Sequence, residues 1–155
     1  MKDIVERLRI VGNTIATMES CTGGYLANRI TNISGSSDVL KFSAVTYSNE
    51  FKIRMGVSSE IIEKYSVYSL ETAKEMSIKI SDFTNSDYGV GITGKINDYD
   101  KNNPFGENNK VFVSIYDRKN KKYYTNKIET INASREHNKK NIIDKIENML
   151  REIIK

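Results

Sequence analysis

The chain has 155 residues, of which 38% are hydrophobic and 28% charged, a length and balance that fit one water-soluble domain. It contains no apolar run long enough to cross a membrane, and its first ten residues alternate charged and apolar side chains too closely for a secretory signal. One cysteine and one histidine exclude an internal disulfide framework and a cysteine/histidine zinc cage. The expected compartment is therefore the cytoplasm, and we expect no cofactor.

The net charge of +4 and the sequence pI near 9.0 raise the question of nucleic-acid binding. The one dense basic cluster, R-K-N-K-K at residues 118–122, lies between two strand-like segments and is typical of a hairpin turn. No zinc-finger, basic-zipper or RNA-recognition signature is present, and lysine, asparagine and isoleucine are abundant throughout. We therefore expect no nucleic-acid partner.

Helices and strands alternate in the first part of the chain. Apolar residues at roughly helical spacing predict a helix at residues 3–10, and a β-prone run predicts a strand at 14–18. Thr22 occupies the N-cap position of the next predicted helix, whose apolar side extends to Ile33. β-branched and aromatic residues then predict a strand at 39–47.

The rest of the chain is predicted to contain three helices, a buried strand, a strand hairpin and a final helix. These elements are expected at residues 49–55, 58–64, 69–83, 87–93, 110–116, 122–131 and 134–154. Ser58 or Ser59 is the expected N-cap of the second helix, and Ser69 that of the third. Phe83 falls on the apolar side of that third helix.

Helices interleaved with strands favour a sheet that is covered on both faces. The hairpin near the C-terminus makes that sheet mixed rather than purely parallel. We therefore predict an α/β fold, a three-layer α/β/α arrangement around a mixed β-sheet, with residues 1–155 forming one domain. Residues 95–109 form a long polar loop that holds the only proline, and such loops are usually functional or disordered.

The junction between the first strand and the second helix reads E-S-C-T-G-G, residues 19–24. A strand, a tight glycine-containing turn and a helix start form an anion-binding site, because the first-turn amides lack intrahelical partners. Ser20, Cys21 and Thr22 place potentially nucleophilic groups where such amides hold a phosphate or an oxyanion. A capped helix start without chemistry has the same pattern.

A second motif, Y-S-N-E-F-K, follows the next predicted strand and places Tyr47 at the strand end and Lys52 five residues later. Where the two strands are neighbours, both side chains come near Ser20. A lysine removed from water can serve as the general base of a serine, and a tyrosine can relay or donate a proton. A solvated surface lysine and a half-buried strand tyrosine are the alternatives.

Several motifs in series resemble the C-terminal domain of the CinA family, which includes bacterial nicotinamide mononucleotide deamidases. They are E-S-C-T-G-G, I-S-G-S-S, A-V-T-Y-S-N-E-F-K and V-G-I-T-G, in unbroken order between Thr14 and Gly94. The resemblance continues more weakly to the C-terminus. It implies an α/β/α fold with a mixed sheet, in agreement with the elements predicted above.

The resemblance also implies a metal-free amidohydrolase that converts nicotinamide mononucleotide, a small-molecule nucleotide, to nicotinate mononucleotide and ammonia. It places the catalytic serine on Ser20, the lysine on Lys52 and the tyrosine on Tyr47. A family arginine before the last helix falls within A-S-R-E. The substrate contacts implied in this way are Cys21, Thr22, Gly23, Gly24, Thr93, Gly94 and Arg135.

The chain departs from the family after Gly94, where T-G-I-A-G-P is usual and T-G-K-I-N-D-Y-D-K-N-N-P-F-G stands here. Either the loop is remodelled around a competent site, or the domain is a nucleotide- or phosphate-binding module without hydrolysis. A nucleic-acid interaction protein is a third interpretation. The apolar terminal helices also predict a homo-oligomer.

Overall fold

The structure is a computed structural model that describes residues 1–97, 101 and 103–155. The strands are β1 (Ile15–Glu19), β2 (Leu40–Val45), β3 (Tyr88–Gly94), β4 (Lys110–Asp117) and β5 (Lys122–Glu129). The helices are α1 (Lys2–Val11), α2 (Tyr25–Thr31), α3 (Asn49–Arg54), α4 (Ser59–Tyr65), α5 (Leu70–Thr84) and α6 (Arg135–Ile153), with a 3₁₀ turn at Ser36–Asp38. Each helix and strand predicted from the sequence is present.

Short-range signals set the helix starts. Ser58, Ser69 and Ser134 each accept a hydrogen bond from an amide in the first turn of α4, α5 and α6, as serine N-caps do. Helix α2 lacks such a cap, because it begins at Tyr25 with Gly24 as its cap residue rather than at Thr22. The hydroxyl of Thr22 donates instead to a buried carboxylate, at 2.6 Å from Glu19 Oε2, so the N-cap prediction for Thr22 is wrong.

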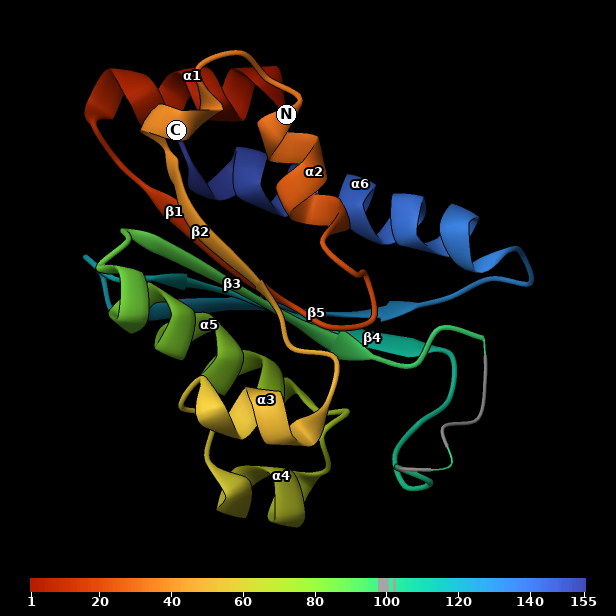
Figure 1. Ribbon diagram of the computed structural model, residues 1–155. Coiled ribbons are helices and arrows are strands. Elements are labelled where there is room, and N and C mark those ends of the chain that lie inside the picture. Colours follow the sequence, from red (N-terminus) through yellow and green to blue (C-terminus); the bar gives the residue numbers. More distant parts are fainter. Residues whose placement is uncertain (98–100, 102) are drawn as a thin grey trace.

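The five strands form one sheet in the order β2-β1-β3-β4-β5 (Figure 1). β1 runs parallel to β2 and to β3, while β4 pairs antiparallel with β3 and β5, which confirms the predicted mixed sheet. The carboxyl ends of β1, β2 and β3 therefore meet at one edge of the sheet. Residues that directly follow these strands come together there, although the sequence separates them widely.

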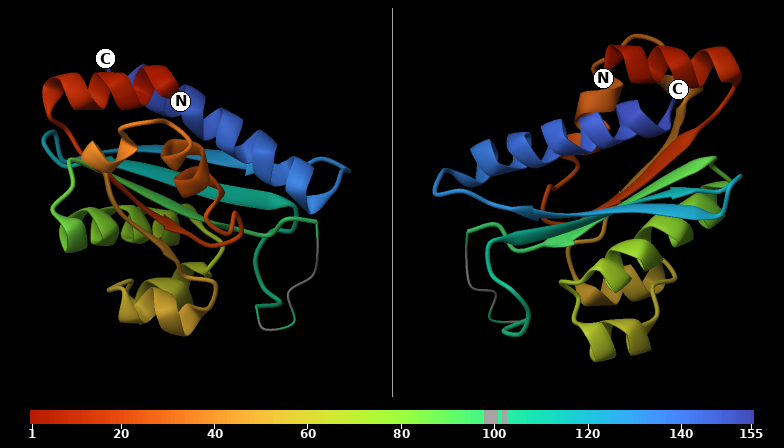
Figure 2. Two further views of the ribbon diagram at one scale, coloured as in Figure 1. Left: turned by 45° about the horizontal axis from the view of Figure 1, so that its top comes forward. Right: turned by 180° about the vertical axis from the view of Figure 1, so that it is seen from behind.

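Helices cover both faces of the sheet, as predicted. Figure 2 shows α1, α2 and α6 on one face and α5, with α3 and α4 beyond it, on the other. The larger apolar core lies under the first group, and the smaller one lies under α5. Gly91 allows α5 to approach β3 closely, because a Cβ atom there would lie 2.2 Å from the Ala73 carbonyl oxygen.

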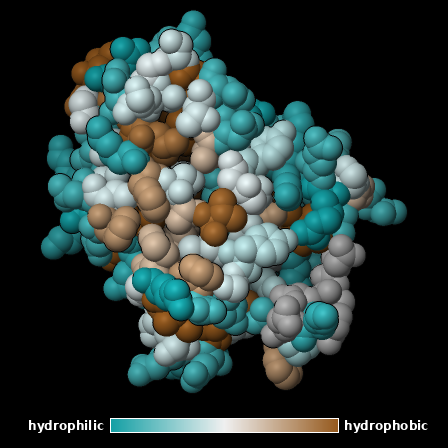
Figure 3. Space-filling model, viewed as in Figure 1, coloured by the Kyte–Doolittle hydropathy of each residue, from teal (hydrophilic) through white to brown (hydrophobic). Residues whose placement is uncertain are grey.

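Two features of the surface differ from the sequence expectations or extend them. Phe83, which the sequence places on the apolar side of its helix, does not lie in the core. It is 66% exposed, and the centre of its ring lies 5.5 Å from that of Phe42. Edge strand β2 and helix α3 carry further exposed apolar side chains, which are Val45, Phe51 and Ile53. Brown and tan side chains are visible among the hydrophilic ones over the middle of the face shown in Figure 3. The predicted homo-oligomer stays a prediction.

The segment between β3 and β4 contains no helix or strand in its described residues, 95–97, 101 and 103–109, as predicted. Residues 98–100 and 102 of the predicted loop lie outside the described residues. The first two residues of this loop are buried, because Lys95 and Ile96 are only 3% and 2% exposed. Within the described part of the chain, none of the helices combines the length and apolar character needed to cross a membrane.

Candidate active site

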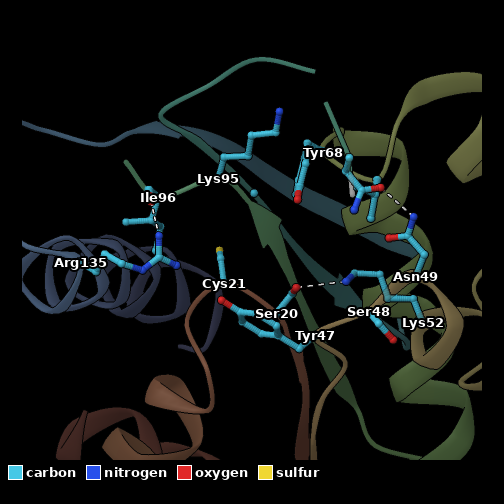
Figure 4. Close-up of a pocket in the computed structure, with 13 residues that line it drawn as sticks. Ser20, Cys21, Tyr47, Ser48, Asn49, Lys52, Tyr68, Lys95, Ile96 and Arg135 are labelled. Carbon is cyan, nitrogen blue, oxygen red and sulfur yellow. Dashed lines mark hydrogen bonds between the residues drawn. The ribbon is translucent and has the colours of Figure 1, made fainter. Parts of the chain in front are cut away.

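A cavity of about 490 Å³ opens where the carboxyl ends of the parallel strands meet. Its walls come from the turn after β1, the start of α3, the segment before α5, the end of β3 and the start of α6 (Figure 4). This volume lies within the range of about 300–1,000 Å³ that small-molecule sites occupy. The position agrees with the general rule that open α/β sheets bind ligands at the carboxyl ends of their strands.

Ser20 and Lys52 form a hydrogen-bonded pair on one wall of the cavity. The Nζ atom of Lys52 lies 3.1 Å from Ser20 Oγ and 2.7 Å from the carbonyl oxygen of Thr46. Lys52 is 2% exposed and Ser20 is 7% exposed, so both groups are largely removed from water. The structure thus excludes the alternative of a solvated surface lysine and places a potential base on the serine.

The turn that presents Ser20 is held by a buried carboxylate that the sequence analysis did not single out. Glu19, at the end of β1, is 0% exposed. Its oxygens accept hydrogen bonds from the amides of Leu26 (3.1 Å) and Ala27 (2.9 Å), in addition to the Thr22 hydroxyl. The positive N-terminus of α2 is therefore compensated by the protein's own carboxylate. These amides are not available for a ligand.

Cys21 follows Ser20 and also borders the cavity, but its thiol is buried, with an exposed fraction of 4%. Burial raises the pKa of the Cys21 thiol to about 12, although the nearby positive charges of Lys52 and Arg135 oppose that rise. A thiol with this pKa is protonated at neutral pH and is a weak nucleophile. Of the two neighbouring candidates, Ser20 is the one with a base in contact.

Tyr47 lies at the rim of the cavity and is 66% exposed, so it is not the half-buried strand residue that one interpretation anticipated. In Figure 4 its ring lies beside Ser20, and its hydroxyl points to the side of the cavity away from Lys52. Tyr47 is therefore near the serine but does not share the buried environment of the lysine. A substrate that enters the cavity would pass this ring.

Arg135 reaches the cavity from the first residue of α6, and its guanidinium donates to the carbonyl oxygen of Ile96. This contact fixes the arginine against the segment that follows β3. Gly94, the last residue of β3, also borders the cavity. The fold thus joins six of the residues selected from the sequence around one cavity: Ser20, Cys21, Tyr47, Lys52, Gly94 and Arg135.

The other four selected residues do not border it. Thr93 is 0% exposed and donates its hydroxyl to the carbonyl oxygen of Val67, and Thr22 is held by Glu19. Gly23 and Gly24 have φ angles of 64° and 90°, which form the turn, and the Gly23 amide donates to the Ser20 carbonyl oxygen. Direct contact of these four residues with a substrate stays a prediction.

The sequence analysis missed several residues of the cavity. Asn49 donates a hydrogen bond of 2.8 Å to Asn103, which connects α3 to the loop before β4. Lys95 and Tyr68 lie on the wall across from Ser20, with the Lys95 ammonium 4.9 Å from the centre of the Tyr68 ring. Lys95 had one readable signal, since it directly follows the strand-end motif T-G. Tyr68 and Asn103 had none.

The described lining of the cavity is strongly positive. Lys52, Lys95 and Arg135 border it, and the described lining residues include neither aspartate nor glutamate. In the part of the chain that the structure describes, no three His, Cys, Asp or Glu side chains cluster so as to hold a metal ion. The arrangement favours a small anionic ligand presented to a serine.

Fold and cavity together define an α/β domain with a buried serine–lysine pair at the carboxyl edge of its sheet. The profile of the CinA C-terminal domain family matches residues 1–154, and the chain belongs to this family. It is 40% identical over 120 residues to a putative competence-damage inducible protein of Clostridium kluyveri, an alignment that covers 76% of this chain and 29% of that protein. A protein of the same description from Alkaliphilus metalliredigens is 51% identical over 82 residues, or 52% of this chain and 20% of that protein. The chain therefore spans less than a third of these relatives.

Solved structures share the fold. A CinA superfamily protein from Klebsiella pneumoniae superposes with a TM-score of 0.89 at 21% identity, covering 99% of this chain and 94% of that one. A competence/damage-inducible protein from Agrobacterium tumefaciens gives a TM-score of 0.85 at 24% identity, covering 99% and 95%. At these identities the likeness establishes the fold, a five-stranded mixed sheet flanked by helices.

Proposed function

We propose that this domain is an amidohydrolase in which Ser20 is the nucleophile and Lys52 its general base. The observation that carries the proposal is the 3.1 Å contact between Lys52 Nζ and Ser20 Oγ, made by two buried side chains on the wall of a cavity. An amine in contact with a serine hydroxyl can accept the serine proton when it is in the neutral form.

The proposed substrate is nicotinamide mononucleotide. Two observations support it, the positive lining of the cavity and the resemblance of the E-S-C-T-G-G and Y-S-N-E-F-K motifs to those of the deamidases in the family. The mononucleotide carries a carboxamide that a serine can attack and a phosphate that a cationic cavity can hold. A cavity of about 490 Å³ is large enough for a ligand of this class.

In the proposed reaction Ser20 Oγ attacks the carboxamide carbon while Lys52 takes its proton. Lys52 then returns a proton to the amide nitrogen, the carbon–nitrogen bond breaks, and ammonia leaves an acyl-enzyme ester on Ser20. Water attacks this ester, with Lys52 again as the base, and releases nicotinate mononucleotide. Tyr47 assists proton movement or substrate placement from the rim.

The oxyanion formed in each step needs donors close to Ser20. The Leu26, Ala27 and Gly23 amides already have acceptors within the protein. Among the other amides of the turn, at Cys21, Thr22 and Gly24, those of Cys21 and Thr22 follow the nucleophile directly and are the proposed source. Glu19 is a positioning residue in this proposal, because its hydrogen bonds fix the turn that carries these amides.

Ammonia release from nicotinamide mononucleotide by purified protein is the direct test. The variants are Ser20→Ala, which removes the nucleophile, and Lys52→Met, which removes the amine but keeps the buried aliphatic stem. Each should lower kcat at least about a thousandfold, as loss of a nucleophile or its base does. Lys64→Met, in an exposed lysine at the end of α4, is the matched control and should retain full turnover.

Each outcome decides between the interpretations left by the sequence. Turnover that disappears in both site variants, with unchanged melting temperatures, supports the amidohydrolase. A folded wild type that binds the mononucleotide without releasing ammonia supports the binding module with a remodelled loop. Binding of nucleic acid that weakens steeply with salt, in the absence of turnover, supports the third interpretation.

A further inference from the structure

Lys95 is a buried cation that the proposed reaction does not use. It follows the last residue of β3 and is 3% exposed, yet it borders the same cavity as Ser20. Lysine is almost never fully buried unless a partner compensates its charge, because removing an ammonium from water is costly. The contacts of the Lys95 ammonium therefore indicate which kind of ligand the cavity binds.

The contacts of Lys95 within the protein are weak. Its Nζ atom donates to Asn108 Oδ1 at 3.4 Å, beyond the usual range for a hydrogen bond from nitrogen to oxygen, and lies 4.9 Å from the centre of the Tyr68 ring. No aspartate or glutamate among residues 1–97, 101 and 103–155 forms an ion pair with it. The ammonium is held in place, but no carboxylate of the described residues compensates its charge.

The two other cations of the cavity already have polar partners near the turn or the strand end. Lys52 contacts Ser20 and the Thr46 carbonyl oxygen, and Arg135 contacts the Ile96 carbonyl oxygen. Among these three cations, Lys95 has the longest polar contact, of 3.4 Å, and its charge is therefore the one that an anionic ligand would compensate. Its position also separates it from the proposed nucleophile, since Figure 4 shows Lys95 and Tyr68 side by side across the cavity from Ser20.

We infer that Lys95 is a specificity-determining residue that binds the phosphate of the substrate, the anionic group remote from the amide. This inference rests on the proposed function and extends it by assigning the phosphate contact to one residue of this chain. Tyr68 is a positioning residue, because its ring supports the ammonium through a cation–π contact. Gly106 packs against Tyr68, where a Cβ atom would lie 3.3 Å from Tyr68 Cβ, so the loop before β4 supports the ring.

The test compares nicotinamide mononucleotide with nicotinamide riboside, which has the same amide and no phosphate. Lys95→Met should raise KM for the mononucleotide at least about tenfold, as loss of one charge-assisted contact does, with kcat nearly unchanged. KM for the riboside should stay at the wild-type value. Lys95→Arg should restore much of the affinity for the mononucleotide, since it returns the charge.

The matched control is Lys122→Met. Lys122 lies 4.6 Å from the centre of the Tyr124 ring, the same pairing as Lys95 and Tyr68, but it is exposed on β5 and does not border the cavity. Its kinetics should equal those of the wild type. An equal rise of KM for both substrates in Lys95→Met, or no rise for either, overturns the inference.

A binding measurement separates failure of this inference from failure of the proposed reaction. Calorimetric titration with nicotinate mononucleotide and nicotinate riboside needs no turnover. Wild type should bind the phosphorylated ligand at least about tenfold more tightly, and Lys95→Met should abolish that preference. Lys95→Gln, which keeps a polar end group for Asn108, repeats the test if the methionine variant does not fold. Wild-type protein that binds both ligands equally refutes the phosphate contact even where ammonia release is intact.

Discussion

Replacement of Glu19 tests whether this buried carboxylate holds the turn that presents Ser20. The side chain is 0% exposed and accepts three close hydrogen bonds, from the Thr22 hydroxyl at 2.6 Å and the Leu26 and Ala27 amides at 3.1 and 2.9 Å. A fourth and longer one, of 3.5 Å, comes from the Thr17 hydroxyl. Each buried donor left without an acceptor costs about 1–3 kcal/mol. Glu19→Ala leaves three such donors, so we expect a loss of about 4–5 kcal/mol in the free energy of unfolding.

Glu19→Gln gives the sharper measurement because it keeps the size of the side chain. It retains one acceptor oxygen but turns an NH₂ group toward donors, which should cost about 2 kcal/mol and lower the melting temperature by about 4–8 °C. Urea denaturation and thermal melting measure both values. Ammonia release should fall in parallel, since the Ser20 turn loses its anchor.

Glu60→Gln is the control, because Glu60 is a glutamate in the first turn of α4, at a helix N-terminus as the carboxylate of Glu19 is, but it is exposed. It should change the free energy of unfolding by less than about 0.5 kcal/mol. If Glu19→Gln is as stable as this control and keeps full activity, the carboxylate does not organise the turn, and the reasoning above is refuted.

Two further predictions concern ionisation. Because burial raises the pKa of Cys21 to about 12, its thiol is protonated at neutral pH, so iodoacetamide should leave the folded enzyme active and label it only in urea; rapid labelling of the native protein would contradict this. Burial by itself raises the pKa of Glu147, but hydrogen bonds from the amino terminus and from Arg29 Nη2 at 2.7 Å outweigh it, and the pKa is lowered overall. A lowered folded-state pKa contributes stability above the unfolded-state pKa, and that contribution is lost as the pH falls through the folded-state value. Urea titrations at several pH values should therefore show Glu147→Gln to be less stable than wild type by about 2 kcal/mol at neutral pH and equal to it in strong acid, whereas a constant difference would disprove the linkage.

Local chemistry explains why so much of the secondary structure was predictable. A serine N-cap acts on an amide three residues ahead, as Ser58, Ser69 and Ser134 do, so its effect can be read from a few adjacent residues. The hydrophobic pattern of β3 and the polar run after it likewise lie within single segments. Where the structure departs from the local pattern, at Thr22 and Phe83, a contact with another element decided the outcome.

For the candidate site, too, some features could be read from the sequence and others depend on the tertiary structure. The sequence by itself determined the elements and the mixed sheet, and its motifs selected Ser20, Tyr47, Lys52 and Arg135 as candidate residues. Only the tertiary structure decided which groups touch. The parallel pairing of β1 with β2 brings Lys52 to Ser20 across 32 residues of sequence. The pairing of β1 with β3 brings Lys95 to the same cavity. Burial, which makes Lys52 a candidate base, Cys21 an inert thiol and Lys95 an anion site, is a property of the assembled layers, because no single segment can exclude water from its own side chains.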